Sequence, residues 1–236
     1  MSVKYTLTLV NESTQPRLNF DVYAAIPVTT EQSDGDSKIV NSYRDVYPLA
    51  WLSALTSQSQ SQYRFSWTLE YSFLYAEQGC QAGSLWSPNS VAVDVNPNNK
   101  STNTAYLDYS QGAYSLCLMD AGSGNPVDSS KVYLVTSPSV PSWSQKSGPS
   151  VGLAITAAVD GQTSNPVPAT VTDSGPNLLH TFNLKCTYRV HLSSDEQATM
   201  TDWDAVQNYQ PVDFGSGYAE TCTLQSSNTW QCEAST

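Results

Sequence analysis

Hydrophobic and polar positions alternate most clearly in the stretch from Tyr63 to Tyr75. Its odd positions are aromatic or aliphatic, and its even positions from Arg64 to Ser72 are polar. A repeat of two residues is typical of a strand with one buried face. At about 3.3 Å per residue the strand would be about 43 Å long, which is long for one sandwich layer, so we expect a bend or bulge along it. The inward positions are Tyr63, Phe65, Trp67, Leu69, Tyr71, Phe73 and Tyr75.

Shorter stretches of the same kind occur before and after this strand, separated by turns rich in Asn, Gly and Pro. They predict an all-β fold of antiparallel β-sandwich layers. The further predicted strands are 3–10, 18–26, 91–95, 105–109, 113–119, 131–136, 151–159, 182–192, 221–225 and 229–233.

The domain organisation has two interpretations. Residues 137–150 are rich in Ser and Pro and form the best linker candidate in the chain. In one interpretation they join an N-terminal β-sandwich region, residues 1–140, to a C-terminal β region, residues 150–236. In the other they are a long loop inside one large domain.

Two stretches lack strand alternation. Residues 27–48 predict a long connection rich in Thr, Ser and Asp. Residues 193–220 carry several acidic side chains, and there Thr201 to Asp204 predicts the cap of a short helix that continues to Tyr209.

The end of the chain predicts a β-hairpin. If its turn is centred on Ser227, Cys222 lies opposite Cys232 and Leu224 lies opposite Trp230. The two cysteines are then close enough for a disulfide in an oxidising compartment, and form a thiol pair in the cytosol. No two of the five cysteines have Cys-x-x-Cys spacing, so we expect no metal site.

The charge of the chain excludes several kinds of partner. The net charge is −11 and the pI about 4.3, so we expect no binding of nucleic acid and no attraction to anionic membranes.

The longest nearly apolar run, 151–159, is half of what a membrane span needs, so we expect no stable membrane insertion. Strand alternation begins directly after Met1 where a leader would carry an apolar run, which favours a cytoplasmic protein or leaderless export.

Catalytic motifs are scarce. The two histidines are His180, in phase with the buried positions of its strand, and His191, in phase with the exposed ones. The sequence has no nucleophile elbow for a Ser-His-Asp triad, no phosphate-binding loop and no dinucleotide fingerprint. We therefore expect no cofactor and favour a protein that is not an enzyme.

Aromatic residues in polar loops are the best ligand-binding candidates. Trp143 and Trp203 are candidate stacking platforms, although each could instead anchor its own loop to the core. Asp202 and Asp204 flank Trp203 in the sequence, and Tyr209 ends the short helix predicted there. These three residues complete the candidate set. Paired carboxylates are also the groups that a glycosidase needs, and Asp202, Asp204, Asp213 and Glu70 are candidates for that role.

Several segments resemble the family of the rhizosphere-expressed protein RhiA. They are Leu49–Ser53, Phe65–Phe73, Glu77–Gly79, the opening Tyr5–Ser13 and the ending Thr223–Trp230. The resemblance covers about a quarter of the chain. It implies an all-β bacterial protein with no assigned enzymatic activity that takes part in interactions with plants or other hosts. It implies no site residues, and the five cysteines and the stretches 27–48 and 193–220 depart from the pattern.

The leading hypothesis is a non-catalytic binding or host-interaction protein, with a glycan or a host protein as ligand. Exposed sheet edges also make the chain a candidate homo-oligomer. The alternatives are a hydrolase acting on a glycan or ester with the carboxylates of 193–220, and a secreted toxin or pore-former.

Overall fold

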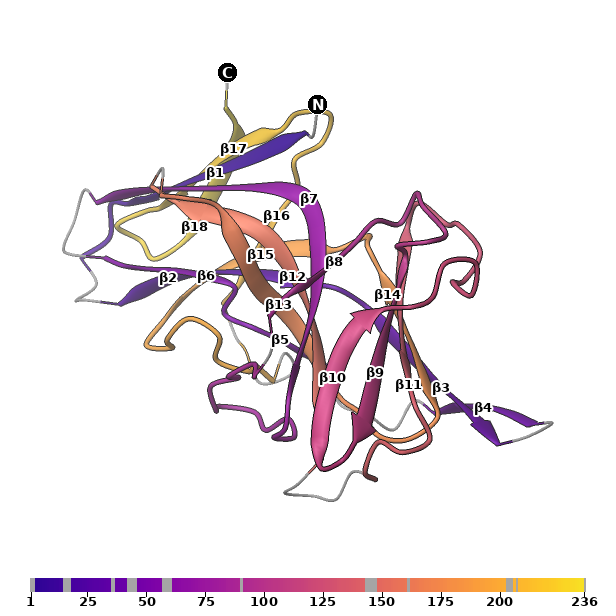
Figure 1. Cartoon of the computed structure of the whole chain (residues 1–236). Coiled ribbons are helices and arrows are strands. Elements are labelled where there is room, and N and C mark those ends of the chain that lie inside the picture. Colours follow the sequence, from indigo (N-terminus) through magenta and orange to yellow (C-terminus); the bar gives the residue numbers. More distant parts are fainter. Residues whose placement is uncertain are drawn as a thin grey trace.

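The computed structural model describes residues 3–14, 18–34, 37–41, 46–56, 61–89, 91–142, 148–160, 162–202, 206 and 208–235. Within these ranges the chain forms strands and no helix, so the predicted all-β class is confirmed. The strands form three sheets, one of which curls strongly, and the layered sandwich arrangement is not confirmed (Figure 1). The helix predicted from Thr201 to Tyr209 falls in part outside the described residues.

The largest sheet has the strand order β18-β17-β1-β7-β12-β13-β5, and β8 also pairs with β7. Its strands are β1 (Lys4–Asn11), β5 (Val46–Pro48), β7 (Gln62–Ala76), β8 (Val93–Val95), β12 (Ser150–Val159), β13 (Asn165–Asp173), β17 (Ala219–Leu224) and β18 (Trp230–Ala234).

The other two sheets are smaller. The six-stranded sheet has the order β10-β9-β11-β14-β3-β4, and the four-stranded sheet has the order β16-β15-β2-β6. Their strands are β2 (Asn19–Ala25), β3 (Val28–Asp34), β4 (Ser37–Asn41), β6 (Leu52–Leu55), β9 (Thr104–Ser110), β10 (Ala113–Leu118), β11 (Lys131–Thr136), β14 (Leu178–Asn183), β15 (Thr187–Ser193) and β16 (Gln210–Val212).

Strand β7 contains the predicted irregularity. Ile155 of β12 pairs with Tyr71, whereas Ala157 pairs with Trp67, so the three residues from Thr68 to Glu70 stand opposite one residue of β12. This bulge coincides with the bend of β7 in Figure 1. The expectation that Leu69 faces inward is wrong: its side chain is 43% exposed, because the bulge lifts it out of the pleat.

Beyond the bulge, β7 is buried on both faces. Tyr71 and Phe73 join the main core, while Leu74 and Ala76 join a second cluster that includes Trp86. The prediction of one buried face therefore fails for the second half of the strand, because the segment around Trp86 covers the other face.

Aromatic contacts connect the three sheets. The Trp67 Nε1 donates a hydrogen bond of 3.0 Å to the Tyr188 hydroxyl, which joins β7 to β15 of the four-stranded sheet. The ring centroids of Phe73 and Phe182 are 5.0 Å apart, which joins β7 to β14 of the six-stranded sheet. The predicted central role of β7 therefore holds in the structure, since it contacts both smaller sheets.

Two predicted segments differ from the structure. The stretch 27–48 contains strands β3, β4 and β5 rather than one long connection. The single strand predicted over 182–192 is two strands: β14 ends at Asn183 in one sheet, and β15 begins at Thr187 in another. The Asn183 Oδ1 accepts a hydrogen bond of 3.1 Å from the Lys185 N–H, which turns the backbone without interrupting the hydrophobic alternation.

All three sheets contain strands from both sides of residues 137–150. For example, β12 pairs with β7 from Ser150 to Val159. This shared pairing favours one folding unit, and the division into two tandem domains remains an untested prediction.

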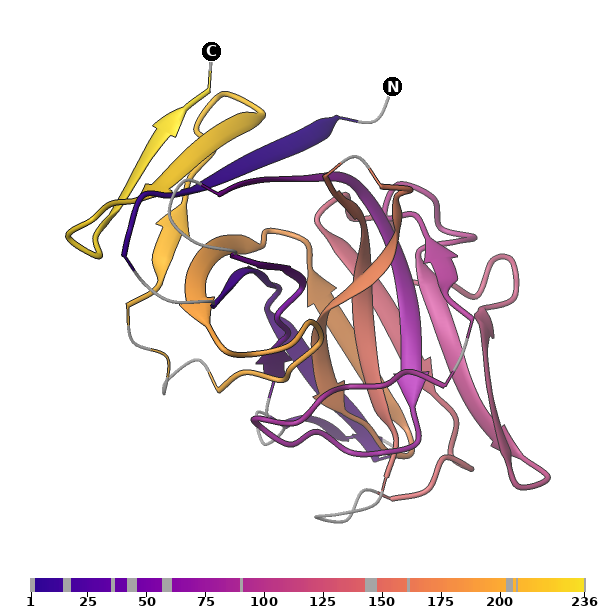
Figure 2. The same ribbon diagram turned by 90° about the vertical axis from the view of Figure 1, so that its left-hand side faces the viewer.

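The first and last strands of the chain, β1 and β18, lie on the same side of the molecule (Figures 1 and 2). Strand β17 pairs in parallel with β1, and β18 then pairs with β17 in the predicted hairpin register. Cys222 lies opposite Cys232 in a disulfide with Cα atoms 4.0 Å apart, and Leu224 lies opposite Trp230.

Candidate ligand-binding pocket

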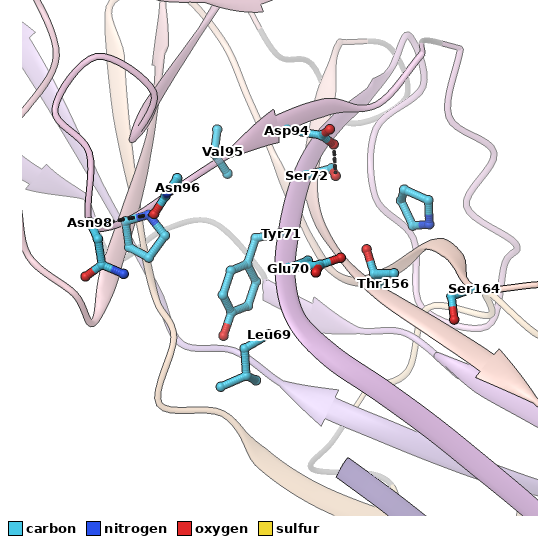
Figure 3. A pocket seen from close by; sticks show the side chains of 12 residues that line it. Leu69, Glu70, Tyr71, Ser72, Asp94, Val95, Asn96, Asn98, Thr156 and Ser164 are labelled. Atoms are coloured by element: carbon cyan, nitrogen blue, oxygen red, sulfur yellow. Dashed lines mark hydrogen bonds between the residues drawn. The ribbon is translucent and has the colours of Figure 1, made fainter. Parts of the chain in front are cut away.

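The bulge of β7 borders a cavity of about 480 Å³ (Figure 3). Polar side chains from β7, from β8 and the turn after it, and from β12 and the approach to β13 converge on it. The lining residues are Leu69, Glu70, Tyr71, Ser72, Asp94, Val95, Asn96, Pro97, Asn98, Thr156, Ser164 and Pro166.

Hydrogen bonds hold one wall of the pocket in place. Ser72 and Asp94 are direct cross-strand partners, and the Ser72 hydroxyl donates a hydrogen bond of 2.7 Å to the Asp94 Oδ1. After β8 the Asn96 Oδ1 accepts a hydrogen bond of 3.0 Å from the backbone N–H of Asn98. The Asp94 carboxylate and the exposed Asn98 side chain are therefore presented from an ordered backbone.

The opposite wall is formed by Glu70 and by side chains from β12 and the segment before β13. In Figure 3 the Glu70 side chain leaves β7 on the side away from Tyr71 and points toward Thr156 and Ser164. Glu70 is exposed because it belongs to the bulge. The bulge thus directs the Glu70 carboxylate into the pocket, whereas a regular strand would have placed this carboxylate elsewhere.

The Tyr71 ring is almost entirely buried beside the pocket, with 6% of its surface exposed. Desolvation raises the pKa of its hydroxyl far above the ordinary tyrosine value, and the neighbouring Cys186 and Tyr5 add to the effect. The ring therefore stays neutral and forms an apolar boundary of the site.

The donor set of the pocket suits a neutral, hydroxyl-rich molecule. Besides the hydroxyl of the buried Tyr71, it offers two carboxylates, two amides and three hydroxyls, and none of its lining residues is Lys, Arg or His. Carboxylates and amides pair well with sugar hydroxyls, and the same carboxylates disfavour phosphates and other anions. Among the described residues, no three His, Cys, Asp or Glu side chains gather in a way that could hold a metal ion.

Of the ligand-binding residues predicted from the sequence, two lie in the described part of the chain, and neither lines this pocket. Trp143, Trp203 and Asp204 lie outside the described residues. Asp202 is exposed and Tyr209 is 36% exposed, and neither lines the cavity. The Arg189 guanidinium lies 4.3 Å from the Tyr209 ring centre, so that ring contacts this chain's own cation.

Two of the described carboxylate candidates, Asp202 and Asp213, do not line this pocket. Asp213 follows β16 and accepts a hydrogen bond of 2.9 Å from the Gly215 N–H, which gives it a role in the local turn. Among the three described carboxylates named for a hydrolase, Glu70 is the one that lines the pocket. Its partner there, Asp94, was not a candidate, because the pairing of β8 with β7 has no signal in a single sequence.

An exposed aromatic ring that sequence reasoning missed lies near the start of β17. Tyr218 is 53% exposed, and its ring centroid is 5.6 Å from that of Tyr5. Tyr5 stacks in turn on Trp67 at 5.8 Å, so three rings form a row across β17, β1 and β7. No local pattern predicts this row, because it depends on the parallel pairing of the first and second-last strands.

The two histidines lie away from the pocket. His180 is fully buried, with Nδ1 3.0 Å from the Thr30 hydroxyl and Nε2 2.9 Å from the Ser174 hydroxyl. Both ring nitrogens are thus satisfied inside the core. His191 lies directly opposite Asp21 in the four-stranded sheet and is partly buried. Neither residue lines the cavity.

The fold and this pocket define an all-β protein with an open, polar pocket. The chain belongs to the RhiA family, whose model matches residues 2–235. No curated protein and no solved structure matches the chain. None of the described residues forms a helix long and apolar enough to cross a membrane.

Proposed function

We propose that this member of the RhiA family is a non-catalytic binding protein that takes an uncharged glycan in the pocket at the β7 bulge. The observation that supports this proposal is the convergence of seven polar side chains on a cavity of about 480 Å³ that has no cationic lining residue. Ligand pockets in proteins commonly measure about 300–1,000 Å³, so the volume suits a short oligosaccharide.

The pocket combines the two kinds of contact that sugars need. Polar groups such as Glu70, Asn98 and Thr156 provide donors and acceptors for hydroxyl groups. Leu69, Pro97 and Pro166 provide apolar contact for the C–H faces of a sugar ring. A rigid wall between Ser72 and Asp94 lowers the entropy lost on binding.

Glycans on the surface of a host cell are a natural source of such a ligand. The family resemblance led us to expect a role in host interaction. Binding of a host glycan in this pocket would account for that role. A host protein would be recognised through its attached sugar.

A glycan array probed with the purified protein tests the proposal, and calorimetry then measures affinity for the best ligand. We expect Glu70→Gln, Asn98→Ala and Thr156→Val each to weaken binding roughly tenfold or more, since each removes a hydrogen-bonding group. The matched control is Glu12→Gln, because Glu12 is exposed and follows the far end of β1, roughly 25 Å along the sheet from the bulge. An array without any saturable ligand would overturn the proposal.

A second candidate function is hydrolysis of a glycan, because Glu70 and Asp94 bring two carboxylates to one pocket. The test is the release of reducing ends from each glycan that binds. The variant Glu70→Gln with Asp94→Asn should abolish the release. The sequence also suggested a hydrolase that uses the carboxylates of residues 193–220. Substituting Asp202, Asp204 and Asp213 together tests that hypothesis, and retained turnover in this variant would contradict it.

A further inference from the structure

Strand β10 is an edge of the six-stranded sheet. It pairs with β9 on one side, and no other described strand pairs with its second side. An edge strand presents a row of backbone N–H and C=O groups that can pair with another strand.

The register of the β9–β10 hairpin shows which groups point outward. Gln111 and Gly112 both have positive φ, 53° and 83°, as in a two-residue hairpin turn. The Met119 N–H donates a hydrogen bond of 3.0 Å to the Thr104 carbonyl, so the odd residues of β10 bond to β9. The backbone groups of the even residues Tyr114, Leu116 and Leu118 therefore point away from β9.

Only part of this edge is open. The Tyr114 carbonyl accepts a hydrogen bond of 3.4 Å from the Tyr75 hydroxyl, and the two rings lie 5.5 Å apart. The end of β7 thus occupies the first outward position. The open groups belong to Leu116 and Leu118, and the Leu118 side chain is 37% exposed.

Strand β10 also lacks the charges and prolines that protect several other edges. Its sequence, Ala-Tyr-Ser-Leu-Cys-Leu, contains no charged residue and no proline. Among the other edge strands, β18 carries Glu233, and β5 and β16 contain a proline. The edge strand β6, Leu-Ser-Ala-Leu, is also uncharged, but its Leu55 carbonyl accepts a hydrogen bond from the Tyr63 hydroxyl. In a chain of net charge −11, a second copy can approach an uncharged edge such as β10 without like-charge repulsion.

We propose that two copies of this chain pair antiparallel through β10, about a two-fold axis beside Cys117. In this register Leu116 of each copy lies opposite Leu118 of the other. The outward groups of these residues form four backbone hydrogen bonds, and each exposed Leu118 side chain is covered by the facing Leu116. The order β11-β9-β10 of one copy then continues as β10-β9-β11 of the other, so that both copies share one continuous sheet.

This register places the Cys117 residues of the two copies directly opposite each other. The two Cys117 residues face each other as a non-hydrogen-bonded pair, for which the Cα separation is about 4.5 Å. The chain already forms a disulfide between directly opposed strand residues, since the Cα atoms of Cys222 and Cys232 are 4.0 Å apart. Cys117 is also the exposed one of the three free cysteines, so it reports the pairing by cross-linking.

Sedimentation velocity of the full chain, run with reductant over increasing concentration, measures the association. We expect a reversible species of twice the 25.7 kDa chain mass. Leu118→Pro removes an outward N–H without touching a bond to β9, and Leu118→Lys places like charges in the contact. Both variants should remain monomeric, whereas the control Leu118→Val should still dimerise. Retained thermal unfolding shows that each variant is folded.

Cross-linking tests the register. Copper–phenanthroline with oxygen takes two electrons and two protons from the two facing thiols and joins them as a disulfide. We expect a covalent dimer in the wild type, none in Cys117→Ser, and an unchanged non-covalent dimer in Cys117→Ser. A wild-type chain that stays monomeric at every concentration would overturn the proposal. So would a dimer that Leu118→Pro and Leu118→Lys leave intact.

Discussion

The indole of Trp86 lies directly over Gly152. A Cβ atom built on Gly152 would be 2.7 Å from the Trp86 Cη2 and 3.0 Å from the Thr170 carbonyl oxygen. The Trp86 Nε1 donates a hydrogen bond of 2.8 Å to the Ser150 hydroxyl, so the ring is fixed over β12 and has little room to move. This contact closes the second core cluster on the outer face of β7 and β12.

Gly152→Ala should therefore destabilise the protein by about 1–3 kcal/mol, because an added methyl group overpacks a fixed ring and a backbone carbonyl. The free energy of unfolding in urea, followed by tryptophan fluorescence, measures the change. Gly217→Ala is the control, since the nearest atom to its added Cβ, the Phe214 carbonyl oxygen, is 3.5 Å away. Equal stability of Gly152→Ala and wild type would contradict the packing described.

Asp21 predicts how stability depends on pH. Its side chain is fully buried, and desolvation raises its pKa from 3.8 to about 6, against the opposing hydrogen bonds from Ser193 and Ser53. As pH rises from about 4 to 6, the unfolded chain loses this proton before the folded chain does. Asp21 therefore lowers the free energy of unfolding across this window, by on the order of 3 kcal/mol.

Asp21→Asn should stabilise the protein at pH 7 and flatten the slope between pH 4 and 6, because a neutral amide avoids the cost of burying a charge. Urea unfolding at several pH values gives both quantities. Asp120→Asn serves as the control, since Asp120 is exposed. A lower stability of Asp21→Asn than of wild type at pH 7 would show that the charged form is favoured in the fold.

Disulfide formation between Cys222 and Cys232 is tested by counting thiols in the unfolded protein. Three should react without reductant, those of Cys80, Cys117 and Cys186, and five after reduction. The bridge closes a loop of 10 residues, so replacing both cysteines by serine should cost on the order of 2–3 kcal/mol. Five reactive thiols without reductant would mean that the purified chain lacks the bridge.

Local sequence patterns predicted those features of the fold that depend on residues close together along the chain. The alternation of Tyr63 to Tyr75 predicts β7, and the symmetry of Cys222 and Cys232 about Ser227 predicts the hairpin register. Strand β13 was missed, because Pro166 and Pro168 interrupt its strand signal.

The pocket could not be predicted in the same way. It depends on the pairing of β8 with β7 and on a bulge whose extent is set by β12, nearly 90 residues further along the chain. Glu70 therefore appears in the sequence as one outward residue of a regular strand, and only the pairing shows that it turns toward Thr156. Strand alternation carries no information about which distant strand becomes the neighbour.

The pairing of β12 with β7 predicts that the chain unfolds as one unit. Nine of the ten residues of β12, Ser150–Val159, pair with β7, and β17 supplies the outer neighbour of β1. A fragment of residues 1–140 would leave β7 without β12 and expose Phe73 and Tyr75, so it should not fold alone. We expect a single urea transition, with the same midpoint by far-ultraviolet circular dichroism and by tryptophan fluorescence.

Fragments 1–140 and 150–236 should gain structure only when mixed or expressed together, because each then provides the strands that the other lacks. Independent cooperative unfolding of either fragment would instead support two tandem domains joined near 137–150.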